Sequence, residues 1–134
     1  MTAVDTSVVV PALATWHEAH EPSRHAASGA SIPAHALLES YAVLTRLPAP
    51  HRLDSSTASE LLGRWFPPSR ILELDRAQTG SLLARLAAAG VDGGSAYDGI
   101  IALTTAAHDE TLLTRDARAS ATYERLGVPY RLVD

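Results

Sequence analysis

The sequence predicts a single α/β domain with a central, mostly parallel five-stranded sheet and helices on both of its faces. Short β-branched or apolar runs alternate with longer amphipathic stretches from end to end, and no repeat or low-complexity segment interrupts them. The length of 134 residues, 46% of them hydrophobic, suits one domain with a single core.

The first strand is expected over residues 2–5, and residues 6–14 follow it directly as a helix. Pro11 reduces the regularity of that helix, because proline lacks the backbone N–H that a helix interior needs. The polar stretch 17–28 predicts a second short helix that starts after Pro22.

A second short strand is expected over residues 30–32, ended by Pro33. Residues 34–47 then form a strong helix, closed by the two prolines that follow it. Asp54 offers an N-cap for another helix over 57–65, which a Pro-Pro pair stops.

The second half of the chain alternates more regularly. Asp75 caps an alanine- and leucine-rich helix, and the glycines after it make the next turn flexible. We expect strands at 71–74, 111–114 and 129–133. Helices are expected at 76–89, 95–107 and 117–126. Parallel sheets of this kind bind ligands at the carboxyl ends of their strands.

Composition excludes several classes of function. The formal charge is −4, from 15 acids and 11 bases, and every base is arginine. Without lysine there is no phosphate-binding P-loop and no Schiff-base chemistry, and without cysteine there is no disulfide, thiol nucleophile or zinc ribbon. No Gly-x-Ser-x-Gly elbow of a serine hydrolase occurs. The start of the chain lacks the pattern of a signal peptide, so we expect a cytoplasmic protein.

Four acids stand at strand ends or inside apolar helix starts, where a carboxylate is unusual: Asp5, Glu39, Asp98 and Asp116. The carboxyl ends of parallel strands meet at one edge, so these four can share a pocket. Their charges would repel one another strongly unless a cation neutralised them, and oxygen-only ligands favour Mg²⁺ or Mn²⁺. The other 11 acids balance the 11 arginines, so the acidity does not count against a nucleic-acid substrate.

Each of these acids also has an ordinary structural explanation. Asp5 and Asp116 could N-cap the helices that they precede, and Asp98 could close a capping box at the start of its own helix. Glu39 could pair with an arginine such as Arg46. Capping explains single acids but not their joint placement.

Four segments carry a resemblance to a known family: Val-Asp-Thr-Ser at 4–7, Leu-Leu-Glu-Ser-Tyr at 37–41, Ala-Tyr-Asp-Gly-Ile-Ile-Ala at 96–102 and Leu-Leu-Thr-Arg-Asp at 112–116. The chain resembles a PIN-domain ribonuclease and, within that superfamily, the VapC-type toxins of bacterial toxin–antitoxin pairs. The segments occur in the family's order and span nearly the whole chain. The departures are Gly99, where alanine is common, and Pro11 inside the first helix.

The resemblance implies that residues 1–134 form a PIN-like, metal-dependent nuclease domain. By this resemblance the family's metal-site acids correspond to Asp5, Glu39, Asp98 and Asp116. The expected metal ligands are Asp5, Asp98 and Asp116, and Asp5 and Asp98 are expected to bind the metal most directly. Glu39 and Asp116 are expected to bind the metal through water or to orient the attacking water. Hydrolysis of a phosphodiester by a metal-activated water fits such a site. Residues expected to contact substrate or to support the ligands are Thr6, Ser7, Thr114 and Arg115.

The resemblance also implies an RNA substrate, a homodimer and a cognate antitoxin that inhibits the enzyme. Faces at 82–86 and 37–44 are candidates for the dimer interface. Two other classes stay open: a phosphoacceptor signalling domain, which normally requires a lysine, and a non-catalytic interaction module. The second could use the apolar residues near 61–66, although core packing is their more common role.

Other side chains have a functional and a structural interpretation. Arg115 and Arg118 could reach phosphates or be solvated. Trp16 and Tyr97 could stack on RNA bases, or they could lie in the core or at an interface. The histidine cluster His17, His20 and His25 lacks the spacing of a helical zinc site, and Pro22 is expected to break the helix between the last two.

Overall fold

The computed structural model describes all residues, 1–134. Its strands are β1 (Thr2–Val4), β2 (Ile32–Pro33), β3 (Ile71–Leu72), β4 (Thr111–Thr114) and β5 (Tyr130–Leu132). Its helices are α1 (Thr6–Leu13), α2 (His20–Ala27), α3 (Ala34–Leu44), α4 (Ser55–Trp65), α5 (Arg76–Ala88), α6 (Ser95–Ala107) and α7 (Ala117–Arg125). The α/β class and the parallel strands are confirmed. None of the helices combines the length and apolarity needed to span a membrane.

The predicted five-stranded sheet is wrong in one respect, because the strands form two sheets. One is three-stranded, in the order β1-β4-β5, and the other pairs β2 with β3. A single bridge joins them where Ser31 lies beside Ala3, with the Val4 N–H donating to the Ser31 carbonyl at 2.9 Å. The second sheet is short because Pro33 has no N–H to donate and serves directly as the N-cap of α3.

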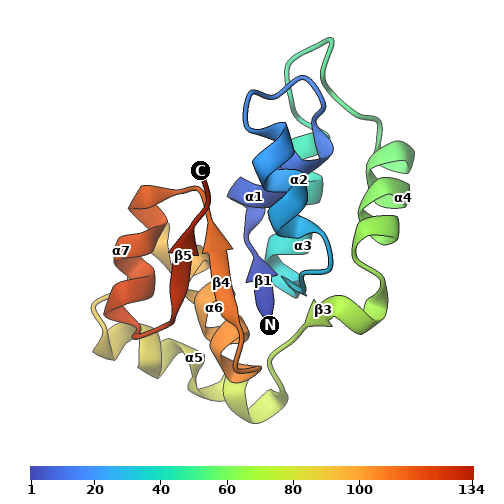
Figure 1. The fold of residues 1–134 in the computed structure, drawn as a ribbon. Coiled ribbons are helices and arrows are strands. Elements are labelled where there is room, and N and C mark those ends of the chain that lie inside the picture. The colour runs from blue at the N-terminus through green and yellow to red at the C-terminus, as the bar shows by residue number, and fades with distance from the viewer.

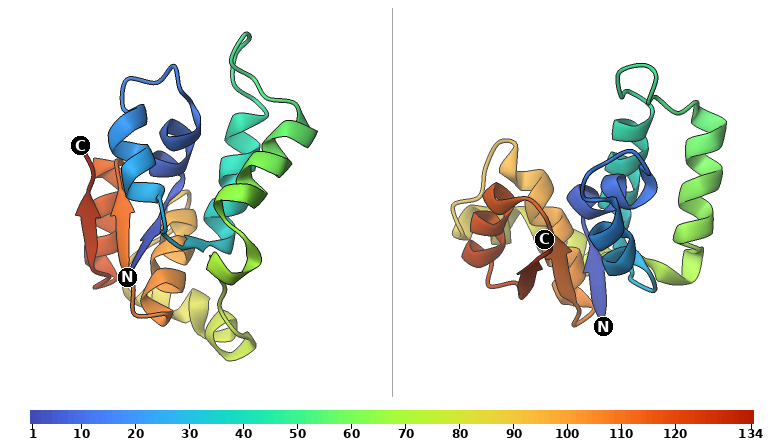
Figure 2. Two further views of the ribbon diagram at one scale, coloured as in Figure 1. Left: turned by 45° about the vertical axis from the view of Figure 1, so that its right-hand side comes forward. Right: turned by 45° about the horizontal axis from the view of Figure 1, so that its top comes forward.

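The parallel strands direct all their carboxyl ends to the same side of the molecule. Figure 1 shows the N-terminus at the start of β1 and the C-terminus near the opposite end of the sheet. Helices α6 and α7 lie beside β4 and β5, and α4 lies on the outer side of α3, away from the three-stranded sheet, in every view (Figures 1 and 2). Helix α6 contacts both β2 and β4, so it bridges the two sheets.

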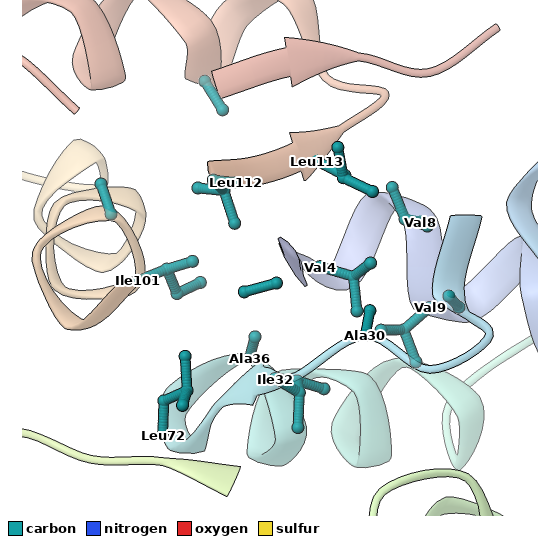
Figure 3. Close-up of a cluster of buried hydrophobic side chains, with 14 of the residues drawn as sticks. Val4, Val8, Val9, Ala30, Ile32, Ala36, Leu72, Ile101, Leu112 and Leu113 are labelled. Carbon is teal, nitrogen blue, oxygen red and sulfur yellow. The ribbon is translucent and has the colours of Figure 1, made fainter. Parts of the chain in front are cut away.

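The hydrophobic core lies between β1, β4 and the helices α1, α3 and α6. In Figure 3 the side chains of Ile101 on α6 and Leu112 on β4 face each other, and Val4 on β1, Val8 on α1 and Ile32 on β2 lie in the same cluster. Each of them is at most 1% exposed. This packing fixes the positions of the strand ends, from which the functional side chains project.

Helix boundaries follow the sequence closely, with two corrections. Helix α2 begins at His20 and contains Pro22 in its first turn, where the missing N–H has no helical partner to lose. Helix α3 ends at Leu44, short of the expected residue 47, because the Thr45 hydroxyl bonds the Tyr41 carbonyl at 2.8 Å as the chain turns away. Pro11 lies inside α1, as predicted, and is buried.

The apolar residues at 61–66, at the end of α4, are buried or half-buried. Leu62 and Phe66 are buried in the core, which confirms the packing interpretation for these two side chains. A shallow apolar groove of about 380 Å³ remains between α3 and α4, lined in part by Leu38, Tyr41 and Phe66.

Candidate active site

A polar cleft of about 570 Å³ opens where β1 and β4 end. All four acids singled out in the sequence lie in it, and no other acid does. The lining residues are Asp5, Thr6, Ser7, Glu39, Val43, Arg46, Asp98, Ile101, Asp116 and Arg118. The four acids come from separate segments of the chain, and the fold brings their side chains together in one cleft.

Asp5 is the most buried of the four acids, at 4% exposure. It N-caps α1, and its Oδ1 accepts hydrogen bonds from the Ser7 amide, at 3.0 Å, and from the Ser7 hydroxyl. Its Oδ2 accepts a hydrogen bond from the hydroxyl of Tyr123, a fully buried side chain on α7, at 2.8 Å. Burial raises the pKa of Asp5, while these hydrogen bonds oppose the rise. The carboxylate is therefore held from both sides.

Hydroxyl groups connect the start of α1 to the turn after β4. The Ser7 hydroxyl oxygen accepts a hydrogen bond from the Arg115 amide at 2.7 Å and lies 3.2 Å from the Thr114 hydroxyl oxygen. The Thr114 hydroxyl in turn accepts from the Asp116 amide at 3.1 Å. The predicted supporting residues Ser7 and Thr114 thus lie beneath the acids, with Thr114 fully buried.

Asp116 N-caps α7 and still faces the cleft. Its Oδ1 accepts from the amides of Arg118, at 2.9 Å, and Ala119, at 3.3 Å. For Asp5 and Asp116 the capping interpretation and the shared pocket are both correct, since one carboxylate can do both.

Glu39 and Asp98 form the opposite wall, from α3 and α6. Glu39 accepts a weak hydrogen bond from the Thr6 hydroxyl at 3.4 Å, and its other oxygen lies 3.4 Å from His35 Nε2, so the predicted arginine pair is wrong. Helix α6 has Gly94 as its N-cap with no side-chain cap, so the capping box predicted for Asp98 is also wrong. Both acids are free to face the cleft because neither is used as a cap.

The pKa of Asp98 is raised to about 6, mainly by burial and then by the nearby charges of Asp116, Glu39 and Asp5. Arg118 opposes this shift only partly. Burial and the three neighbouring carboxylates therefore destabilise the ionised form of Asp98 when no cation lies between them.

Two arginines line the cleft, and one of them differs from the prediction. Arg118 is in place, with 95% of its side chain exposed and its Nε 3.9 Å from Asp116. Arg46 is the second cation, and it reaches the cleft from the turn that follows α3. Arg115 does not line the cleft; it contributes its backbone N–H to Ser7.

The donor set suits a hard divalent cation, since it consists of carboxylate and hydroxyl oxygens without nitrogen or sulfur ligands. The mutual repulsion that raises the pKa of Asp98 is the kind of strain that a bound cation removes. No three of the acids converge into a preformed cage, so binding would need small side-chain adjustments.

The histidine cluster does not form a metal site. His17 Nδ1 accepts a hydrogen bond from the Ala19 amide, and His20 Nδ1 lies 2.9 Å from the Pro11 carbonyl. Trp16 and Tyr97 are 49% and 58% exposed, so the core interpretation is wrong for both, and the interface interpretation stays a prediction.

Comparisons with known proteins agree with this architecture. The family model described as PIN domain matches residues 2–125. Ribonuclease VapC40 of Mycobacterium tuberculosis is 45% identical over 134 residues, covering 99% of each chain. The chain is thus similar to that ribonuclease along its whole length.

Two solved structures share the fold at lower sequence identity. VapBC2 from Rickettsia felis, bound to a DNA fragment from its promoter, superposes with a TM-score of 0.66 at 15% identity, covering 99% of this chain and 98% of that one. VapC20 of Mycobacterium tuberculosis, a sarcin-ricin loop cleaving toxin, has a TM-score of 0.66 at 16% identity, with 90% and 94% covered.

Proposed function

Because the chain belongs to the PIN-domain family and, within it, to the VapC-type ribonucleases, we propose that it is a divalent-metal-dependent endoribonuclease and the toxin of a toxin–antitoxin pair. Mg²⁺ is the proposed ion, with Mn²⁺ as a substitute. The observation that carries this proposal is the meeting of Asp5, Glu39, Asp98 and Asp116 in one cleft, where their charges raise the pKa of Asp98.

The proposed metal ligands are Asp5, Asp98 and Asp116. A divalent ion bound there would supply a water of lowered pKa and would neutralise charge on the phosphodiester. Asp5 is suited to a fixed ligand because Ser7 and Tyr123 hold both of its oxygens in place. Asp98 accepts no hydrogen bond from the start of its helix, so its carboxylate is free to turn toward a cation.

The remaining cleft residues have proposed roles in orientation. Glu39, on the wall opposite Asp5, orients the attacking water and accepts its proton. Arg46 and Arg118 hold the phosphates on either side of the scissile bond. Thr6 keeps Glu39 turned toward the cleft through its hydroxyl.

The proposed partners are an antitoxin and a second copy of the chain. A fold shared with VapBC2 supports an antitoxin, whose arginine could pair with the cleft acids in place of the metal. Leu38 and Leu83, at 63% and 76% exposure, lie on the two faces considered for dimerisation. An RNA substrate implies that the protein acts in the cytoplasm.

The test is cleavage of an RNA pool by the purified chain in Mg²⁺ or Mn²⁺, with a chelator control. Asp5→Asn and Asp98→Asn are each expected to lower the rate by about 100-fold or more, since metal ligation and charge stabilisation are lost together. Glu60→Gln is the matched control, because Glu60 is an exposed acid on α4 outside the cleft. Undiminished cleavage in both cleft variants, or cleavage in chelator, would contradict the proposal.

A phosphoacceptor domain is not supported, since the cleft contains arginines as its only permanent cations and the chain has no lysine. Binding of RNA without cleavage in any divalent metal would instead support a non-catalytic module.

A further inference from the structure

Two aromatic rings form a stacked pair beside the cleft that the proposed chemistry does not use. The rings of Tyr97, on α6, and His35, on α3, are nearly parallel, with an angle of 9° and 5.5 Å between their centroids. Tyr97 immediately precedes Asp98, and His35 lies one helical turn before Glu39. The pair is therefore attached to two of the four cleft acids.

The pair is exposed on one side only. His35 has 25% of its side chain exposed, and its Nε2 lies 3.4 Å from a Glu39 oxygen. Tyr97 is 58% exposed although one of its ring faces is covered by His35. With His35 beside one face of the ring, the exposed area of Tyr97 leaves room for a ligand against the other face.

An aromatic group and a cation lie on either side of Glu39 along the chain. His35 is in the first turn of α3, and the cleft residue Arg46 lies in the turn that follows the end of this helix at Leu44. Glu39 lies between them, so a chain crossing the cleft would meet an aromatic face at one end, the acids in the middle and a cation at the other end. Single-stranded nucleic acid presents both bases and phosphates to such a surface.

We propose that Tyr97, supported by His35, is a stacking site for one base of the RNA close to the scissile phosphodiester. This inference rests on the proposed function. Tyr97 and His35 do not line the apolar groove between α3 and α4. A flat aromatic face beside a phosphate-directed site fits a nucleobase, which stacks on such a ring.

A stacking site predicts a specific kinetic signature. Stacking contributes to binding in both the ground state and the transition state, so its loss raises KM and leaves kcat nearly unchanged. Because stacking strength depends on the base, a purine is expected to bind there more tightly than a pyrimidine. A change in the position of Asp98 would instead lower kcat.

The test is the steady-state cleavage of a single-stranded RNA oligonucleotide by the full chain in Mn²⁺. Tyr97→Ala is expected to raise KM roughly tenfold, with kcat within about twofold. Tyr97→Phe retains the ring and should restore KM to near the wild-type value. Leu132→Ala, which shortens an exposed side chain on β5, is the control for loss of surface area.

Substrates with one abasic nucleotide, moved stepwise past the cleavage site, identify the stacked base. At one position the missing base should raise the KM of the wild type about as much as Tyr97→Ala does, and should add nothing to the KM of that variant. An unchanged KM for Tyr97→Ala, or equal abasic penalties in both proteins at every position, would overturn the stacking site.

Two further outcomes have defined meanings. If Tyr97→Ala changes the molar mass measured by light scattering and leaves KM unchanged, Tyr97 is a protein contact and the stacking site is wrong. If the wild type cleaves no RNA, the proposed function fails, and fluorescence anisotropy with a labelled oligonucleotide still tests stacking. A weaker affinity of Tyr97→Ala than of Tyr97→Phe would then support the stacking site alone.

Discussion

The two walls of the cleft are built differently. The wall from β1, β4 and α7 holds Asp5 by three hydrogen bonds, and Asp116 is fixed as a helix cap. The wall from α3 and α6 carries Glu39 and Asp98, with one weak hydrogen bond from Thr6 and like charges that raise the pKa of Asp98. The first wall is preorganised, whereas the second is under electrostatic strain that a cation would relieve.

RNA cleavage and folding stability should depend strongly on the uncharged hydroxyl groups that hold Asp5 in the preorganised wall. Ser7→Ala removes the hydroxyl that contacts Asp5 and leaves the Arg115 amide without its acceptor. We expect a loss of about 10- to 100-fold in RNA cleavage and about 1–3 kcal/mol in the free energy of unfolding. Cleavage assays and urea denaturation measure the two effects. Ser81→Ala, an exposed serine on α5, is the control, and equal effects at both sites would show that Ser7 does not preorganise this wall.

Tyr123→Phe tests the same wall from the other side, because it removes only the hydroxyl that donates to Asp5. We expect a loss of about 1.5–3 kcal/mol in the free energy of unfolding, as for a buried hydrogen bond to a charged group. Tyr130→Phe is the matched control, since the Tyr130 hydroxyl bonds the exposed Glu124. Thermal and urea unfolding should rank the two variants in that order; a larger cost at Tyr130 would contradict the assignment.

In the strained wall, removal of a charge should increase the free energy of unfolding, whereas the variants of Ser7 and Tyr123 should decrease it. The pKa of Asp98 in the folded chain is about 6, against 3.8 for the unperturbed group, so ionised Asp98 destabilises the fold above pH 6. Without metal, Asp98→Asn should therefore raise the free energy of unfolding at pH 8 by on the order of 1 kcal/mol, after allowance for partial solvent exposure.

This gain should shrink as the pH falls from 6 and should disappear below about pH 4, where Asp98 is protonated in both the folded and the unfolded wild type. Urea denaturation at pH 8 and at pH 4, both in chelator, measures it. A variant that is less stable than the wild type at pH 8 would show that Asp98 is not strained.

Local patterns in the sequence predicted the preorganised wall only in part. Asp5 and Asp116 follow apolar strands, so their place at one sheet edge was evident, and the hydroxyls of Ser7 and Thr114 adjoin them in the chain. Tyr123 was missed because its partner Asp5 is 118 residues away and no local pattern distinguishes it from other helix residues. Such contacts depend on how α7 packs, which the sequence does not state.

The strained wall shows a different limit of sequence reasoning. The isolation of Glu39 and Asp98 among apolar residues identified them, but a capping box and an arginine pair were equally compatible with the local sequence. The break between the two sheets was also missed, since it depends on Pro33 being both the end of a strand and the cap of α3. The stacking of His35 on Tyr97 requires α3 and α6 to be placed in space.

The central claim is that the four carboxylates form a binding site for a divalent cation, and calorimetric titration of Mn²⁺ into the purified chain at pH 7 tests it without any choice of RNA. The account predicts saturable binding to the wild type that Asp98→Asn weakens strongly and Glu60→Gln leaves unchanged. Absence of binding to the wild type, or equal affinity in the wild type and Asp98→Asn, would contradict it.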